Sequence, residues 1–156
     1  MVKRLRGILV TVFGIACCAC ASTGSVAEWS SYNSSAYGML LANKESLVRS
    51  GDSARVWVAH GATTLKPGQA VYMKGLYAFD CREHKYQLLQ EVGYDRGGQA
   101  SSIPVEQGFQ NVVPDSMQQA IEQFACKPTN GWWTPVVRVP ETLEKRIQAA
   151  NEGFFD

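Results

Sequence analysis

Residues 70–94, AVYMKGLYAFDCREHKYQLLQEVGY, contain two apolar and aromatic runs on either side of a short polar link. The first run ends at Cys81, the link is 82–84, and the second run covers 85–94. Runs that are rich in aromatic and aliphatic residues and bounded by polar links are typical of strands. The short link between them therefore predicts an antiparallel hairpin with His84 at its tip.

The two runs also indicate how their side chains are distributed. Gly75 interrupts the alternation of the first run and is typical of a bulge. In the second run, apolar residues at a period of two are expected to share one face, with Gln90 interrupting them: Tyr86, Leu88, Val92 and Tyr94.

Further short strands are predicted from residue 39 onward. A turn cluster at 50–53 separates residues 46–49 from the β-branched and aromatic run 55–60, which predicts a second hairpin. Residues 99–105 predict another strand, and Pro104 places the end of that strand at a sheet edge.

The clearest helical pattern covers residues 116–126. Ser116 is a good N-cap, and Gln119 three residues later completes a capping box. Lys127-Pro128 ends the helix. An apolar stripe follows at helical spacing: Met117, Ala120, Ile121, Phe124 and Ala125. A helix that covers one face of an antiparallel sheet predicts the α+β class.

The N-terminus has the pattern of an export signal. Three basic residues, Lys3, Arg4 and Arg6, precede a short apolar segment that ends in small residues. Residues 1–16 are therefore predicted to be a signal peptide of the lipoprotein type, which takes no part in the fold.

Three cysteines lie at the end of this signal. Cys17 follows Gly-Ile-Ala, which resembles a bacterial lipobox, so Cys17 is the expected acylation site and palmitate one expected chain. Cys20 is a second candidate for acylation, and ordinary signal-peptidase cleavage after Ala21 is the alternative. Residues 17–36 are predicted to form a flexible tether. Trp29 is the earliest residue that we expect to belong to the folded part.

Cys81 and Cys126 are the two cysteines outside this cluster. In an oxidising export compartment, such an isolated pair predicts one disulfide. The bond would tie the end of the long strand to the end of the helix, and for a loop of about 45 residues it would contribute roughly 4 kcal/mol. Two unpaired buried thiols are the alternative.

Residues 127–156 are predicted to be a C-terminal extension. They contain Trp132 and Trp133 in an irregular segment flanked by Pro and Gly, and a weaker helical pattern at 141–152. The two tryptophans either pack over the sheet or form an exposed binding patch, since clustered exposed aromatic residues mark interaction sites.

Charge and motifs exclude several function classes. The chain has 15 Lys and Arg against 14 Asp and Glu, and loss of residues 1–16 removes three of the basic residues. A mildly acidic mature chain does not favour nucleic acid as a partner. His60 and His84 belong to no metal or catalytic motif, so no catalytic residue, metal or cofactor is expected.

Several segments together resemble the bacterial surface-adhesin protein E family. They are Lys44–Arg49 with the later Val56–Val58, Phe79–Arg82 with Tyr86–Leu89, and Val113–Ser116 opening a helix that ends at Cys126. The resemblance covers residues 37–126 and implies a small exported lipoprotein in which an antiparallel sheet carries a disulfide-tethered helix. It further implies adhesion to host or extracellular matrix proteins.

Two functions follow as hypotheses. The first is an adhesin-type binding module, anchored by lipid to the bacterial outer membrane and exposed at the cell surface. The second is a structural or accessory lipoprotein of the cell envelope, which has no host ligand and can face the periplasm.

Overall fold

The computed structural model describes residues 28–34, 38–61, 70–127 and 132–136. These residues form nine strands, one α-helix and one short 3-10 helix. In chain order they are β1 (Trp29–Ser34), β2 (Gly38–Asn43), η1 (Lys44–Ser46), β3 (Val48–Ser50), β4 (Ser53–Gly61), β5 (Tyr72–Asp80), β6 (Lys85–Tyr94), β7 (Ala100–Ile103), β8 (Gln110–Asn111), α1 (Met117–Cys126) and β9 (Thr134–Val136).

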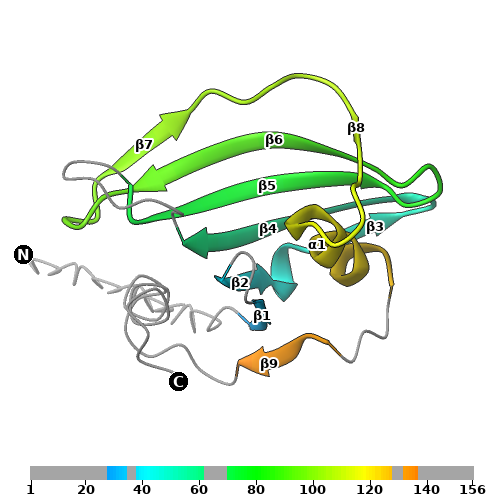
Figure 1. The fold of residues 1–156 in the computed structure, drawn as a ribbon, viewed down its shortest axis with the longest axis horizontal. Helices are drawn as coiled ribbons and strands as arrows, with labels where there is room; N and C mark the ends of the chain where they lie inside the picture. Colours follow the sequence, from blue (N-terminus) through cyan, green and yellow to red (C-terminus); the bar gives the residue numbers. More distant parts are fainter. Residues whose placement is uncertain (1–27, 35–37, 62–69, 128–131, 137–156) are drawn as a thin grey trace, which may run out of the picture.

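The strands form one antiparallel sheet in the order β7-β6-β5-β4-β2-β1-β9. The short strands β3 and β8 pair with β4 and β6. The helix α1 packs on β4 and β5, so it covers one face of the sheet (Figure 1). We call this the inner face and the opposite side the outer face. The predicted α+β class is confirmed, as are the hairpins β3–β4 and β5–β6 and the edge position of β7.

The predicted disulfide between Cys81 and Cys126 is present. Their Cα atoms are 5.6 Å apart, and the bond spans 45 residues of sequence. It joins the turn after β5 to the last residue of α1, as expected from the positions of the two cysteines.

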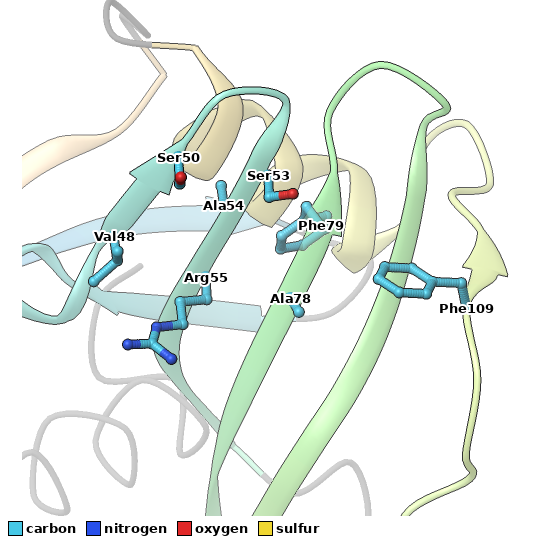
Figure 2. Close-up of a pocket in the computed structure, with 8 residues that line it drawn as sticks. All are labelled: Val48, Ser50, Ser53, Ala54, Arg55, Ala78, Phe79 and Phe109. Atoms are coloured by element: carbon cyan, nitrogen blue, oxygen red, sulfur yellow. The ribbon is translucent and has the colours of Figure 1, made fainter.

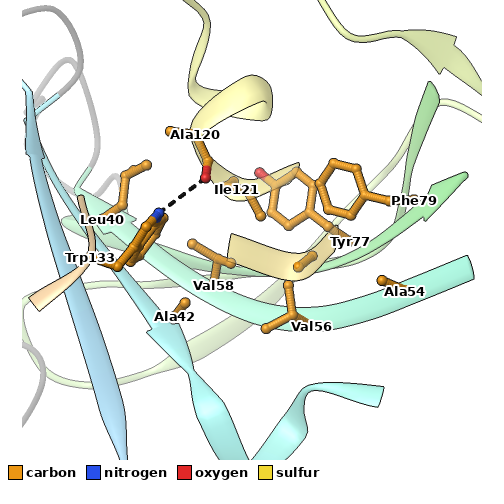
Figure 3. Packing of buried hydrophobic residues seen from close by; sticks show 11 residues of the cluster. Leu40, Ala42, Ala54, Val56, Val58, Tyr77, Phe79, Ala120, Ile121 and Trp133 are labelled. Atoms are coloured by element: carbon orange, nitrogen blue, oxygen red, sulfur yellow. Dashed lines mark hydrogen bonds between the residues drawn. The ribbon is translucent and has the colours of Figure 1, made fainter. Parts of the chain in front are cut away.

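The inner face carries the main core. Its centre consists of five side chains (Figure 3): Val56 and Val58 of β4, Tyr77 and Phe79 of β5, and Ile121 of α1. Of the predicted helix stripe, Ala120, Ile121 and Ala125 are buried, whereas Met117 and Phe124 pack at the margin of the core. Burial of these apolar side chains against the sheet is the main source of stability for so small a helix.

The start of α1 follows the predicted capping box with one difference. The Ser116 hydroxyl accepts a hydrogen bond from the Gln119 amide, as predicted. The Gln119 side chain, however, accepts from the Asp115 amide instead of the Ser116 amide. Asp115 has a positive φ of 59°, in the left-handed region of backbone conformation.

The predicted distribution of side chains on β6 is wrong. Tyr77 lies opposite Leu88 but the preceding Leu76 lies opposite Gln90, so Leu89 is an extra residue in β6. Because an extra residue reverses the alternation of a strand, Leu88 lies on the inner face while Tyr94 lies on the outer face.

The bulge therefore lies in β6, close to Gly75 but not at it. Gly75 serves a different purpose, since a Cβ atom there would lie 2.8 Å from the Tyr77 ring and 2.9 Å from the Leu88 side chain. The absence of a side chain at Gly75 lets the Tyr77 ring lie over the backbone of its own strand.

Two predicted boundaries are also wrong. The segment 17–36 is not a tether throughout, because Trp29–Ser34 forms β1 and pairs with β2. The C-terminal extension contributes β9, which pairs with the other edge of β1. The sheet thus begins by Trp29 rather than at residue 37, and it includes residues well beyond 126.

Three predictions concern residues outside the described ranges: the signal peptide 1–16, the acylation candidates Cys17 and Cys20, and the helical pattern 141–152. Within the part of the chain that the structure describes, no helix is long and apolar enough to cross a membrane.

Candidate binding surface

The first element of the candidate surface is a row of side chains across the outer face. Val48 of β3 lies opposite Arg55 of β4, and Arg55 lies opposite Ala78 of β5. Residues that face one another across neighbouring strands project from the same side of a sheet. Figure 2 shows these three side chains on the side of the sheet away from α1.

This row borders a hollow of about 300 Å³. The small side chain of Ala78 forms part of its floor, while the larger Val48 and Phe109 side chains lie at its margins (Figure 2). Its lining is mostly apolar, and Arg55 is the only charged residue among the described residues that line it: Val48, Ser50, Ser53, Ala54, Arg55, Ala78, Phe79 and Phe109.

Phe109 reaches the hollow because its neighbour Gln110 is held in place. Gln110 starts β8, which pairs with β6, and its side-chain oxygen accepts a hydrogen bond from the Tyr86 hydroxyl at 2.9 Å. The Gln110 side-chain nitrogen donates to Glu106 at 2.9 Å. Partial burial and the nearby Glu106 charge both raise the pKa of Tyr86, so its hydroxyl keeps its proton to a higher pH than an ordinary tyrosine does.

The opposite margin of the hollow is held by Arg49, which lies between Val48 and Ser50 in β3. Its guanidinium projects to the inner side and donates hydrogen bonds to the main-chain oxygens of Phe124 and Ala125. Cations are favourable at the C-terminus of a helix, where carbonyl groups lack partners within the helix. The β3–β4 hairpin is thereby fixed to α1.

The margins of the hollow expose two large apolar side chains. Val48 is 45% exposed and Phe109 is 53% exposed. Arg55 is also exposed. Exposed apolar side chains grouped beside a guanidinium favour binding of a partner by burial of apolar area and by charge.

The structure separates the two tryptophans that the sequence proposed as a binding patch. Trp132 is 74% exposed, whereas Trp133 is only 6% exposed. The Trp133 indole nitrogen donates to the Ala120 carbonyl at 3.1 Å (Figure 3). The Trp133 ring also contacts the rings of Phe124 and Tyr32. Trp133 is therefore a core residue and is wrong as a surface anchor. Trp132 does not line the hollow.

Each of the two histidines lies beside a glutamate side chain. His60 is buried near the end of β4, with Nε2 3.7 Å from a Glu91 oxygen. His84 lies in the β5–β6 turn at a φ of 52°, with Nδ1 2.9 Å from Oε1 of the buried Glu122. Among the described residues, no group of three or more His, Cys, Asp or Glu side chains is placed to hold a metal ion.

The residues around the hollow were not predicted from the sequence. Val48 and Arg55 were recognised only as strand residues on either side of a turn. Phe109 is a single aromatic residue in the polar segment Glu106–Asn111, and such an isolated aromatic residue was the one signal that could have indicated an exposed contact.

Comparison with known proteins identifies a protein family. The family model described as surface-adhesin protein E matches residues 29–127. This range includes β1 through α1 and every residue that lines the hollow, but it ends before Trp132 and β9. No curated protein and no solved structure matches the chain.

Proposed function

The chain belongs to the surface-adhesin protein E family, and we propose that it is an exported binding module that attaches the cell to host or extracellular matrix proteins. The observation that carries the proposal is the pair of exposed apolar side chains at the margins of the hollow on the outer face, Val48 and Phe109. An interface of this kind gains most of its binding energy from a few apolar anchors that a partner covers.

The architecture suits such a role. The disulfide and Arg49 both tie the β3–β4–β5 end of the sheet to α1, so the outer face is presented on a rigid support. A rigid surface loses little side-chain and backbone freedom on binding, which favours affinity. We also propose Trp132, exposed and outside the hollow, as a second contact.

A lipid anchor at Cys17 in the outer membrane is part of the proposal. The pattern of residues 1–16 and the apolar segment before Cys17 support it. Replacing Cys17 with Ser is expected to release the protein from the detergent phase of a phase-partition assay. If the variant still partitions fully into detergent, Cys17 is not the acylated residue, and Cys18→Ser or Cys20→Ser becomes the next test.

The binding proposal is tested with the mature full-length protein on immobilised basement-membrane extract, with serum albumin as the control surface. Saturable binding to the extract and none to albumin is the expected result. Equal, non-saturating signals on the two surfaces would overturn the proposal.

The alternative is an accessory lipoprotein of the cell envelope that faces the periplasm. Protease treatment of intact cells separates the two functions, because only an outward-facing domain is accessible. We expect loss of the domain from intact cells while a periplasmic marker protein stays intact. Full protection of the domain until the outer membrane is permeabilised would favour the accessory role.

A further inference from the structure

We propose that the hollow on the outer face binds a peptide segment of the partner protein in which a bulky apolar side chain lies next to an Asp or Glu. This inference rests on the proposed binding function and names the chemistry that the surface recognises. Three features of the hollow carry it: its size, its apolar lining, and the guanidinium of Arg55 at its wall.

The volume of the hollow indicates how large a ligand group it can hold. At about 300 Å³ it lies at the lower end of the range of ligand pockets in proteins, about 300–1,000 Å³. It is also open to solvent, since Val48 and Phe109 at its margins are each about half exposed. An open hollow of this size suits one side chain of a larger partner better than an enclosed cofactor.

The lining sets the chemistry of that side chain. Val48, Ala78 and Phe109 offer an aliphatic and aromatic surface, and the hydroxyl groups of Ser50 and Ser53 lie beside it. Burial of an apolar side chain against this surface is favourable in proportion to the area removed from water. A ring would also gain from contact with Phe109, since aromatic pairs contribute beyond their buried area.

The charge of Arg55 determines which residue is favoured beside the apolar side chain of the peptide. Arg55 is exposed, and no ion pair joins it to an acidic side chain among the described residues. Both nearest neighbours of Arg55 in the sheet, Val48 and Ala78, are apolar, so no residue directly opposite it neutralises its charge. A guanidinium binds a carboxylate by two parallel hydrogen bonds, which favours Asp or Glu beside the apolar side chain.

The test is a titration of the mature full-length protein, labelled with ¹⁵N, with the capped peptide acetyl-Ser-Gly-Phe-Asp-Gly-Ser-amide. Saturable shifts are expected for the amides of Val48, Ala78 and Phe109. Arg55→Gln is expected to weaken binding about tenfold, the usual size for loss of a charged hydrogen-bond partner. Arg82→Gln, which removes the same charge from the exposed β5–β6 turn, is the matched control and should leave the affinity unchanged.

A second peptide with Asn in place of Asp completes a cycle that isolates the pairing. Wild-type protein should bind this peptide about tenfold more weakly than the first, whereas Arg55→Gln should bind the two peptides equally. If the change from Asp to Asn in the peptide weakens binding tenfold in both proteins, Arg55 does not contact the carboxylate. That result would overturn the inference. Shifts confined to residues outside the hollow would overturn it as well.

Ala78→Leu fills the floor of the hollow and is expected to abolish peptide binding, with an otherwise native amide spectrum as the check on folding. The same variants on basement-membrane extract distinguish this inference from the proposed function. If wild type binds the extract and the Arg55→Gln and Ala78→Leu variants bind it equally well, the peptide assignment is wrong while the binding function stands.

Discussion

The guanidinium of Arg49 donates a hydrogen bond to the main-chain oxygen of Phe124 at 2.9 Å. The bond joins β3 to the last turn of α1 across the inner face. Its neighbours in the strand, Val48 and Ser50, lie on the outer face at the margin of the hollow. The position of the candidate binding surface therefore depends on a contact made on the opposite side of the sheet.

Arg49→Ala removes this contact and leaves the Phe124 and Ala125 carbonyl groups without the guanidinium. We expect a loss of about 1–2 kcal/mol in the free energy of unfolding, below the full value of a buried charged hydrogen bond because the site is partly exposed. Urea unfolding measures it, with Arg82→Ala as the control for loss of charge. A loss that is equal in both variants would contradict the helix contact.

Replacing both Cys81 and Cys126 with Ser removes a bond that closes a 45-residue loop. The unfolded chain gains freedom, so the expected loss of stability is roughly 4 kcal/mol. Urea unfolding of the double variant against the oxidised wild type measures it. A loss below about 1 kcal/mol would show that the contacts of α1 with the sheet suffice without the bond.

Gly75→Ala places a methyl group within 3 Å of the Tyr77 ring and the Leu88 side chain. Overpacking of this kind costs about 1–3 kcal/mol, because a fully packed core cannot shift freely. Gly97→Ala is the matched control, since its nearest neighbouring atom would lie 3.4 Å away. Thermal unfolding should separate the two variants, and equal midpoints would contradict the packing described at Gly75.

The alkaline limit of stability is expected to depend on Tyr77. Burial, with further contributions from the charges of Glu91 and Tyr86, raises the pKa of Tyr77 well above its usual value of about 10. Below that usual value the contribution of Tyr77 to stability is complete. As the pH rises further, the unfolded chain releases the proton while the folded chain keeps it, so stability falls.

Urea unfolding at pH 9 and at pH 11 tests this dependence. The wild type should lose about 1 kcal/mol more between the two values than Tyr77→Phe does, since one pH unit of unmatched titration is worth about 1.4 kcal/mol. The same loss in both proteins would mean that other groups set the alkaline limit.

Local patterns were sufficient to predict α1, the β5–β6 hairpin and the disulfide. The stripe around Ile121 and the paired runs at 70–94 each lie within one short segment, where periodicity is directly visible. β1 and β9 were missed because their pairing is long-range: Ser31 bonds to Thr134, 103 residues away. Both strands are short, with six residues in β1 and three in β9, and neither shows a regular alternation of apolar and polar residues.

The bulge and the hollow were missed for related reasons. The extra residue Leu89 is defined only by its register against β5, which no single strand reveals. The hollow depends on the small side chain of Ala78 lying between residues from three other segments. The sequence left two possibilities for Trp133, packing over the sheet or exposure at the surface. Its hydrogen-bond partner, the Ala120 carbonyl, belongs to α1, which ends before the segment that contains Trp133, so the local sequence could not reveal this contact.

Binding to immobilised basement-membrane extract should be measured for a variant that lacks both exposed apolar side chains at the margins of the hollow, Val48→Ser with Phe109→Ser. Val113→Ser, which replaces a side chain that is 62% exposed and lies outside the hollow, is the control. We predict that the double variant binds about tenfold more weakly or worse at an unchanged thermal midpoint, while the control binds as the wild type does. Undiminished binding by a folded double variant would contradict the assignment of the outer face as the binding surface.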